Sequence, residues 1–279
     1  MKFSLDCYPC AVRQALGAIR RTGMEEERQA TAMQRVMNGL AEVRPGAASP
    51  EIAAHIQGIL REMTGDEDIY AKEKAESTAE ALALYPEWKD AVVHSSDPLE
   101  SAVRLSIAGN IIDFGPMDSY DLEATIQRVM EQPFALNELA ALRATIEESD
   151  DILYLADNTG ETVFDRILIE TIGKPVTYAV KEAPILNDAT CEDASAAGLD
   201  AVAEVISCGA RYPGTLLAYC SVDFIKRFRQ ADLIISKGMG NYEALSSEEA
   251  PIFFLLQVKC DMVGQDLGVP KGSIVITKP

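Results

Sequence analysis

The first half of the chain shows the spacing of apolar residues that is typical of helices. Apolar positions recur every three or four residues, so that they fall on one side of a helix. Ser49 and Pro50 mark one helix start, because serine often caps a helix and proline fits its first turn. No strand is predicted before residue 148. The pattern predicts helices over residues 8–21, 25–42, 49–63, 69–84, 97–109, 121–131 and 136–148.

The pattern changes near residue 150, where short apolar runs replace the helical spacing. Strands that are apolar along their whole length are typical of a parallel sheet with helices on both faces. We therefore predict an α/β fold with two domains, a helical N-terminal domain over 1–148 and an α/β domain over 149–279. The six runs lie at residues 152–156, 175–180, 201–206, 231–236, 251–256 and 273–277.

Composition and charge narrow the classes of function. The 279 residues include 25 Lys and Arg against 44 Asp and Glu, which gives a net charge of −19. Such an acidic surface repels phosphate backbones and anionic lipids, so we expect no nucleic-acid or membrane partner. No apolar run reaches the roughly 18 residues of a membrane span, and the first residues lack a signal-peptide core. We expect a cytoplasmic protein whose six cysteines are reduced.

Polar residues gather directly after three of the predicted strands. In open α/β sheets, ligands bind outside the carboxyl ends of the strands, so this edge is where we expect a site. The three segments are Asp157-Asn158-Thr159-Gly160-Glu161, then Lys181 followed by Asn187-Asp188, and Lys237-Gly238-Met239-Gly240-Asn241-Tyr242-Glu243.

These segments combine oxygen donors with groups that suit an anion. Asp157, Asn158 and Asp188 offer the hard oxygen ligands that Mg²⁺ or Mn²⁺ prefers and that Co²⁺ or Ni²⁺ tolerates. Without a cation, two converging carboxylates would repel each other and one would take up a proton. Lys237 and the backbone N–H groups from Gly238 suit a phosphate, because glycine allows close approach. A metal beside an anion-binding loop indicates phosphoryl chemistry.

Each segment also has a purely structural interpretation. An Asp-Asn-x-Gly sequence after a strand often only caps the next helix, and the Gly238–Gly240 loop can be a plain left-handed turn. Asp188 can form an Asx turn, and Lys181 can be a solvated surface charge. The recurrence of polar residues at successive strand ends nevertheless favours a site.

Other chemistries find less support in the sequence. The two histidines, His55 and His94, lie in the first half, and no GxSxG sequence is present, so a Ser-His-Asp hydrolase is disfavoured. No P-loop sequence occurs. The dinucleotide fingerprint GxGxxG fails because Glu243 stands at the sixth position counted from Gly238.

The cysteines Cys7 and Cys10 form a single CxxC at the start of the first predicted helix. A structural zinc site would need two further ligands, and the chain has no second CxxC. A helix N-terminus lowers a thiol pKa, which leaves a redox role open. Packing at the helix start is the third possibility.

Several segments together resemble one protein family, the metal-dependent damage-control phosphatases. The N-terminal paired cysteines and the KGxGNxE pattern resemble its stand-alone prokaryotic branch. The resemblance spans nearly the whole chain. It is carried by LDCYPCAVRQAL (5–16), AGNIIDFG (108–115), LADNTGETVFDRILIE (155–170), APILNDAT (183–190) and SKGMGNYEAL (236–245).

The resemblance implies a helical N-terminal part joined to a Rossmann-like α/β part. It also implies a divalent ion at the cleft and hydrolysis of small phosphomonoesters, such as sugar phosphates or damaged phosphorylated metabolites. Asp157, Asn158 and Asp188 match the family's metal ligands. The residues expected on the substrate side are Lys237, Gly238, Gly240, Asn241 and Glu243 in the phosphate loop, Asn110 and Asp113 from the helical region, and Glu161 after the first strand.

We therefore predict a metal-dependent phosphatase with Asp157, Asn158 and Lys237 as catalytic residues. Either water or Asp157 itself attacks the phosphorus atom, and the sequence leaves both open. One rival is an S-adenosylmethionine-dependent methyltransferase, although its glycine loop should follow the first strand. A second rival is a non-catalytic module that binds a phosphorylated metabolite. An oligomer is possible in each case.

Overall fold

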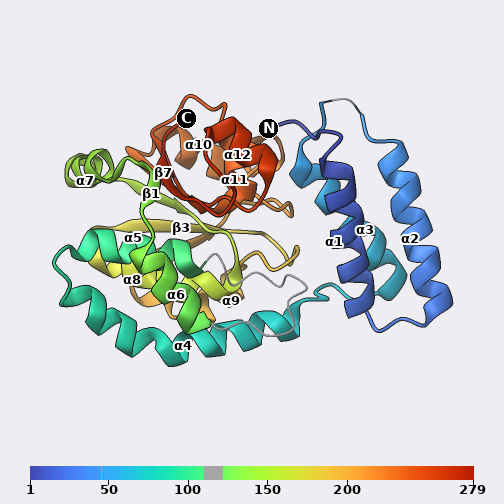
Figure 1. The fold of residues 1–279 in the computed structure, drawn as a ribbon, viewed down its shortest axis with the longest axis horizontal. Helices are drawn as coiled ribbons and strands as arrows, with labels where there is room; N and C mark the ends of the chain where they lie inside the picture. The colour runs from blue at the N-terminus through green and yellow to red at the C-terminus, as the bar shows by residue number, and fades with distance from the viewer. Residues whose placement is uncertain (45, 110–121) are drawn as a thin grey trace.

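The computed structural model describes residues 1–44, 46–109 and 122–279. The first three helices lie side by side in a bundle, set beside the rest of the molecule (Figure 1). Their shared core includes Ala15, Val36 and Ile56. These helices, at predicted positions, are α1 (Cys7–Arg21), α2 (Glu26–Ala41) and α3 (Ser49–Thr64).

In the described residues, seven strands form one sheet in the order β1-β7-β6-β5-β2-β3-β4. Neighbouring strands are parallel except β6 and β7, which are antiparallel. The predicted α/β class with a mainly parallel sheet is confirmed. The strands are β1 (Phe134–Asn137), β2 (Ile152–Leu155), β3 (Val176–Val180), β4 (Glu204–Ser207), β5 (Leu233–Lys237), β6 (Ile252–Gln257) and β7 (Ile274–Thr277).

The strand order creates a switch point between β2 and β5. From β2 the chain proceeds to β3 and β4 on one side, and it then returns to β5 and β6 on the other. At such a point the connections leave in opposite directions, which opens a crevice at the carboxyl ends of the two strands. The segments after β2 and β5 are those in which the sequence predicts a site.

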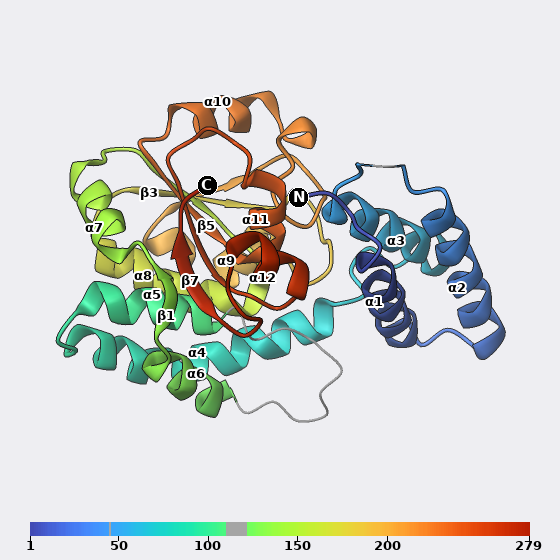
Figure 2. The ribbon, with the colours of Figure 1, turned by 45° about the horizontal axis from the view of Figure 1, so that its top comes forward.

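Helices cover both faces of the sheet (Figures 1 and 2). One face packs on a core that includes Leu105, Tyr154 and Phe164, and the other on a core that includes Phe224 and Phe254. The first face carries α4 (Ala71–Val93), α5 (Pro98–Gly109), α6 (Leu122–Glu131), α7 (Leu139–Glu148), α8 (Thr162–Ile172) and α9 (Cys191–Ala196), and the second carries α10 (Val222–Gln230), α11 (Gly238–Leu245) and α12 (Asp261–Leu267).

Three elements of the structure differ from the sequence prediction. Strand β1 occupies residues expected to be loop and helix; it is a four-residue edge strand whose burial alternates, so no apolar run announces it. Helix α4 continues through Pro86 to Val93, well past the predicted end at 84. Strand β4 begins at Glu204 rather than 201, because residues 199–201 form a 3₁₀ turn.

The sheet and its covering helices draw on both sides of residue 148. Strand β1 and helices α4 and α5 come from the predicted helical domain, yet β1 pairs with β7 and α5 packs on α8. The division into domains 1–148 and 149–279 stays a prediction. Within the described residues, no helix is both long and apolar enough to cross a bilayer.

Candidate active site

The carboxyl ends of β2 and β5 place Asp157 next to the start of α11. Leu155 pairs with Ser236 in parallel register, so the segments that follow emerge at the same edge. Gly238 has a φ of +76°, and a Cβ built on it would lie 1.8 Å from Asp157 Oδ2. Only glycine fits here, for both backbone conformation and space. The first turn of α11 therefore lies directly against the Asp157 carboxylate.

Asp188 reaches the same place from the loop after β3. Asn158 and Asp188 form an isolated antiparallel bridge. The N–H of Ala189 donates to the Asp157 carbonyl at 2.9 Å, and the N–H of Thr159 donates to the Asn187 carbonyl at 2.8 Å. The structure thus brings together the loops that carry the three predicted metal ligands, whose role as ligands stays a prediction.

The two aspartates are in electrostatic conflict. Burial raises the pKa of Asp188 to about 8; the Lys181 ammonium opposes this shift and the Asp157 carboxylate adds to it. Lys181 Nζ lies 3.5 Å from Asp188 Oδ2. Burial, and to a smaller extent the second carboxylate, therefore disfavours the ionised form of Asp188.

A divalent cation suits the balance of charge in this region. Four carboxylates and two ammonium groups are buried here, which leaves two negative charges in excess when all are ionised. Among the described residues no cluster of three or more His, Cys, Asp or Glu side chains has a metal-holding arrangement. An amide oxygen beside Asp157 and Asp188 would add a third hard donor for such a cation. The six buried charges are Asp157, Glu161, Asp165, Asp188, Lys181 and Lys237.

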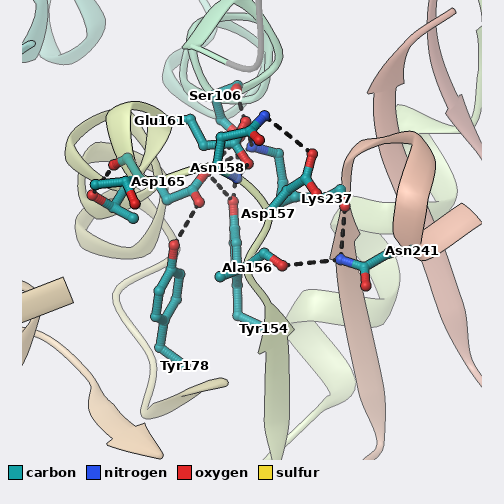
Figure 3. Close-up of polar contacts among 12 residues, drawn as sticks. Ser106, Tyr154, Ala156, Asp157, Asn158, Glu161, Asp165, Tyr178, Lys237 and Asn241 are labelled. Carbon is teal, nitrogen blue, oxygen red and sulfur yellow. Dashed lines mark hydrogen bonds and ion pairs between the residues drawn. The ribbon is translucent and has the colours of Figure 1, made fainter. Parts of the chain in front are cut away.

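Asn158 is placed to supply that oxygen after a rotation of its amide. Its Nδ2 donates to Asp157 Oδ2 at 3.3 Å (Figure 3). A cation at Asp157 would repel the amide N–H and attract the carbonyl oxygen, so binding would reverse the amide. The donor set and the charge therefore fit a divalent ion.

Lys237 lies next to Asp157 (Figure 3) and is fully buried. Its Nζ donates to Asp165 Oδ1 at 2.7 Å and to the Ser106 carbonyl at 2.9 Å, and it lies 3.5 Å from Glu161 Oε2. Glu161 in turn accepts the N–H of Asn158 at 3.0 Å. Lys237 and Glu161 therefore support the backbone of the ligand loop, and their predicted contact with substrate stays a prediction.

Asp165 is the centre of this buried network. It accepts hydrogen bonds from Tyr154 at 2.7 Å, from Tyr178 at 2.8 Å and from the Ser106 hydroxyl at 3.1 Å. Burial and the Asp165 charge raise the pKa of both tyrosines well above the ordinary value. Asp165 was not among the residues predicted from the sequence. The feature that could have pointed to it is the position of a carboxylate among the apolar residues of α8.

Replacing Lys237 by methionine should lower the free energy of unfolding by about 3–5 kcal/mol, because Asp165 and Glu161 would be left buried without their cation. Denaturant unfolding measures this change. Lys226→Met, at an exposed position, is the matched control and should cost less than about 0.5 kcal/mol. Equal effects of the two substitutions would show that the buried ion pairs do not stabilise the fold.

Asn241 connects three segments of the site. Its Nδ2 donates to the carbonyls of Ala156 at 3.0 Å and Lys237 at 2.8 Å, and its Oδ1 accepts from Thr215 at 2.8 Å. A Cβ at Gly214 would lie 2.3 Å from the Gly240 carbonyl oxygen, so the two backbones are in close contact. Asn241 and Gly240 therefore fix the shape of the loop that begins α11.

The remaining predicted residues lie in different environments. Glu243 lies where α11 meets α3. Burial raises its pKa, and the charge of the chain's N-terminus and a hydrogen bond with Ser49 oppose this shift. Asn110 and Asp113 lie outside the described residues. The interpretation of Lys181 as a surface charge is wrong: it is buried, and its Nζ donates to the Gly214 carbonyl at 2.8 Å.

The CxxC cysteines are free thiols. Cys7 Sγ accepts the N–H of Ser4 at 3.4 Å. Burial raises the pKa of Cys10, with Cys260 and Cys7 adding to the shift, the opposite of the lowering expected at a helix N-terminus. A metal or redox role for the pair stays a prediction.

The sheet order and the oxygen donors at its switch point define an α/β protein with a candidate ligand site between β2 and β5. The chain belongs to the family described as the damage-control phosphatase ARMT1-like domain, whose model matches residues 3–275. The resemblance to damage-control phosphatases is thereby confirmed, while the particular branch stays a prediction.

Curated relatives and a solved structure agree with this family. A damage-control phosphatase of Pyrococcus horikoshii is 36% identical over 99% of this chain and 97% of its own length. One of Archaeoglobus fulgidus is 32% identical over 99% and 98%. The crystal structure of a DUF89 family protein from Pyrococcus horikoshii is 34% identical, with a TM-score of 0.92 over 100% of this chain and 99% of that one.

Proposed function

We propose that this chain hydrolyses small phosphomonoesters with the help of a divalent metal ion. The observation that carries the proposal is the meeting of the Asp157–Asn158 and Asp188 loops at the β2/β5 switch point, against the start of α11. The names of the relatives from Pyrococcus horikoshii and Archaeoglobus fulgidus support a phosphatase in particular.

In this proposal Asp157, Asn158 and Asp188 hold the ion. The chemistry that Mg²⁺, Mn²⁺, Co²⁺ or Ni²⁺ supplies when bound there is positive charge at a phosphoryl oxygen and acidity for an attacking water. The first N–H groups of α11, from Gly238 to Gly240, have no partner within the helix and bind the other phosphoryl oxygens. Lys181 and Lys237 lower the negative potential that the carboxylates create.

The substrates we propose are small phosphorylated metabolites, including sugar phosphates and damaged metabolites. With a net charge of −19, the protein attracts a phosphate only through local positive groups. Glu243 contacts the remainder of the substrate, and Asn241 preserves the loop that receives the phosphate. For Asn110 and Asp113, which lie outside the described residues, a role in substrate binding is carried over from the resemblance alone.

Removal of the metal should abolish phosphate release. We expect activity to fall at least about 100-fold after chelation and to return with Co²⁺, Ni²⁺, Mn²⁺ or Mg²⁺, because each ion neutralises the phosphoryl charge. A panel of phosphorylated metabolites, with released phosphate measured, is the assay. Full activity in excess chelator would remove the metal from the mechanism. Binding of a panel member without release would indicate a non-catalytic binding module.

A further inference from the structure

Leu186 has an unusual backbone conformation close to the site. Among the described residues it is the one non-glycine residue with a positive φ, at +48°. It is the second residue of a turn in which the N–H of Asp188 donates to the Ile185 carbonyl at 3.1 Å. A positive φ at this position alone is the pattern of a type II′ turn, where glycine normally stands. The chain therefore has leucine where the backbone favours glycine.

The Leu186 side chain packs into the N-terminal bundle. It contacts the apolar cluster where the bundle meets the start of α4, and it lines a cleft there together with Leu60 and Ile69. Leu186 is half-buried there, so part of its side chain is covered by the bundle. The cluster consists of Ala18, Ile19, Met24, Ala32, Leu60 and Tyr70.

A second contact holds Pro184, just before the turn. Arg211 Nε donates to the Pro184 carbonyl at 2.7 Å, and its guanidinium also bonds Glu67 Oε2 at 2.6 Å. Glu67 lies in the segment that follows α3, so the residues just before Leu186 are tied to the bundle side as well.

The far end of the turn carries the site. Asn187 accepts the N–H of Thr159, and Asp188 bridges Asn158. A continuous path of contacts thus runs from the bundle through the Leu186 side chain to the backbone that places Asp188 beside Asp157. A relaxed turn at Leu186 would rotate the peptide that leads to Asp188.

We propose that Leu186 is a positioning residue: the docking of its side chain in the bundle holds the turn in the left-handed conformation that directs Asp188 toward Asp157. This inference rests on the proposed metal site and adds that the helical bundle completes it. Strained backbone conformations often lie next to functional residues, where the strain is part of the geometry that the site needs.

Three substitutions separate the docking from the strain. Leu186→Gly removes the side chain but accepts the backbone conformation, Leu186→Ala removes the side chain and keeps the strain, and Leu186→Met keeps a long side chain that can dock. We expect Co²⁺ to bind Leu186→Met about as well as wild type. Binding to Leu186→Ala should be about tenfold weaker than to Leu186→Gly, because an undocked alanine leaves the left-handed conformation.

Calorimetric titration of the full-length protein with Co²⁺ alone measures these affinities. Amide exchange of residues 157–160 and 185–190 in the metal-free protein reports the turn directly and should be fastest in Leu186→Ala. A position with a negative φ would give the reverse order, with glycine worse than alanine, because glycine loses more conformational freedom on folding.

The outcomes distinguish this inference from the proposed function. Wild-type affinity and exchange in Leu186→Ala, with Co²⁺ still bound, would overturn the positioning role and leave the metal site standing. Failure of the wild-type protein to bind Co²⁺ would overturn the metal site, and this inference with it. Whether or not Leu186→Ala folds, a Leu186→Gly variant that binds Co²⁺ as tightly as wild type would overturn the need for docking, and weaker binding to Leu186→Gly than to wild type and Leu186→Met would support it.

Discussion

Asp157→Ala should reduce phosphate release by at least about 10³-fold, because the proposed ion loses a charged ligand and can no longer be held against the phosphate. Steady-state kinetics with the best substrate of the metabolite panel measures the loss. The fold should survive: the Asp157 backbone carbonyl still accepts the N–H of Ala189. In the metal-free protein the thermal midpoint should stay or rise, because the Asp157 charge disfavours the ionised form of Asp188.

A loss of activity without a loss of metal-free stability would identify Asp157 as a functional carboxylate. Asp200→Ala, at an exposed position before β4, is the matched control and should leave both activity and midpoint unchanged. A wild-type rate in Asp157→Ala would contradict the assignment of Asp157. Parallel losses of activity and metal-free stability would instead assign it a structural role.

Much of the fold was predictable because its central strands are buried on both faces. Strands β2, β5 and β6 are buried along their whole length, and such strands appear in the sequence as uninterrupted apolar runs. Strand β1 gave no such signal, because a short edge strand needs only alternate apolar residues. The sequence also could not show that β2 and β5 are neighbours, because strand order depends on how the connections cross the sheet.

The candidate site was predictable in its location and less so in its chemistry. The rule that ligands gather at carboxyl strand ends placed Asp157 and Asp188 at one edge. The same rule also placed Lys181, which directly follows β3, at this edge, but it did not show that Lys181 is buried. The burial of Lys237 was not foreseeable, because its partner Asp165 is 72 positions away in the chain. The strain at Leu186 depends on a contact with the distant bundle, which no local pattern reveals.

Gly238→Ala should reduce phosphate release at least about 100-fold and lower the free energy of unfolding by several kcal/mol. An added Cβ would lie 1.8 Å from Asp157 Oδ2 and 2.3 Å from its Cγ. The first turn of α11 would have to retreat, or the Asp157 carboxylate would have to rotate away from Asp188. Either movement separates the oxygen donors from the N–H groups proposed to bind phosphate, and displacements of about 1 Å are costly in catalysis.

Gly173→Ala separates this clash from the cost of the backbone conformation. Gly173 ends α8 with a φ of +65°, close to that of Gly238, and nothing lies within 4 Å of a Cβ built there. It should therefore show only the cost of a left-handed alanine, about 1–2 kcal/mol, with unchanged activity. Thermal unfolding and kinetics of the two variants, compared at a temperature where both are folded, measure the difference. Because the two positions share their φ, any excess loss in Gly238→Ala belongs to the contact with Asp157; equal behaviour of the two variants would mean that this contact does not shape the site.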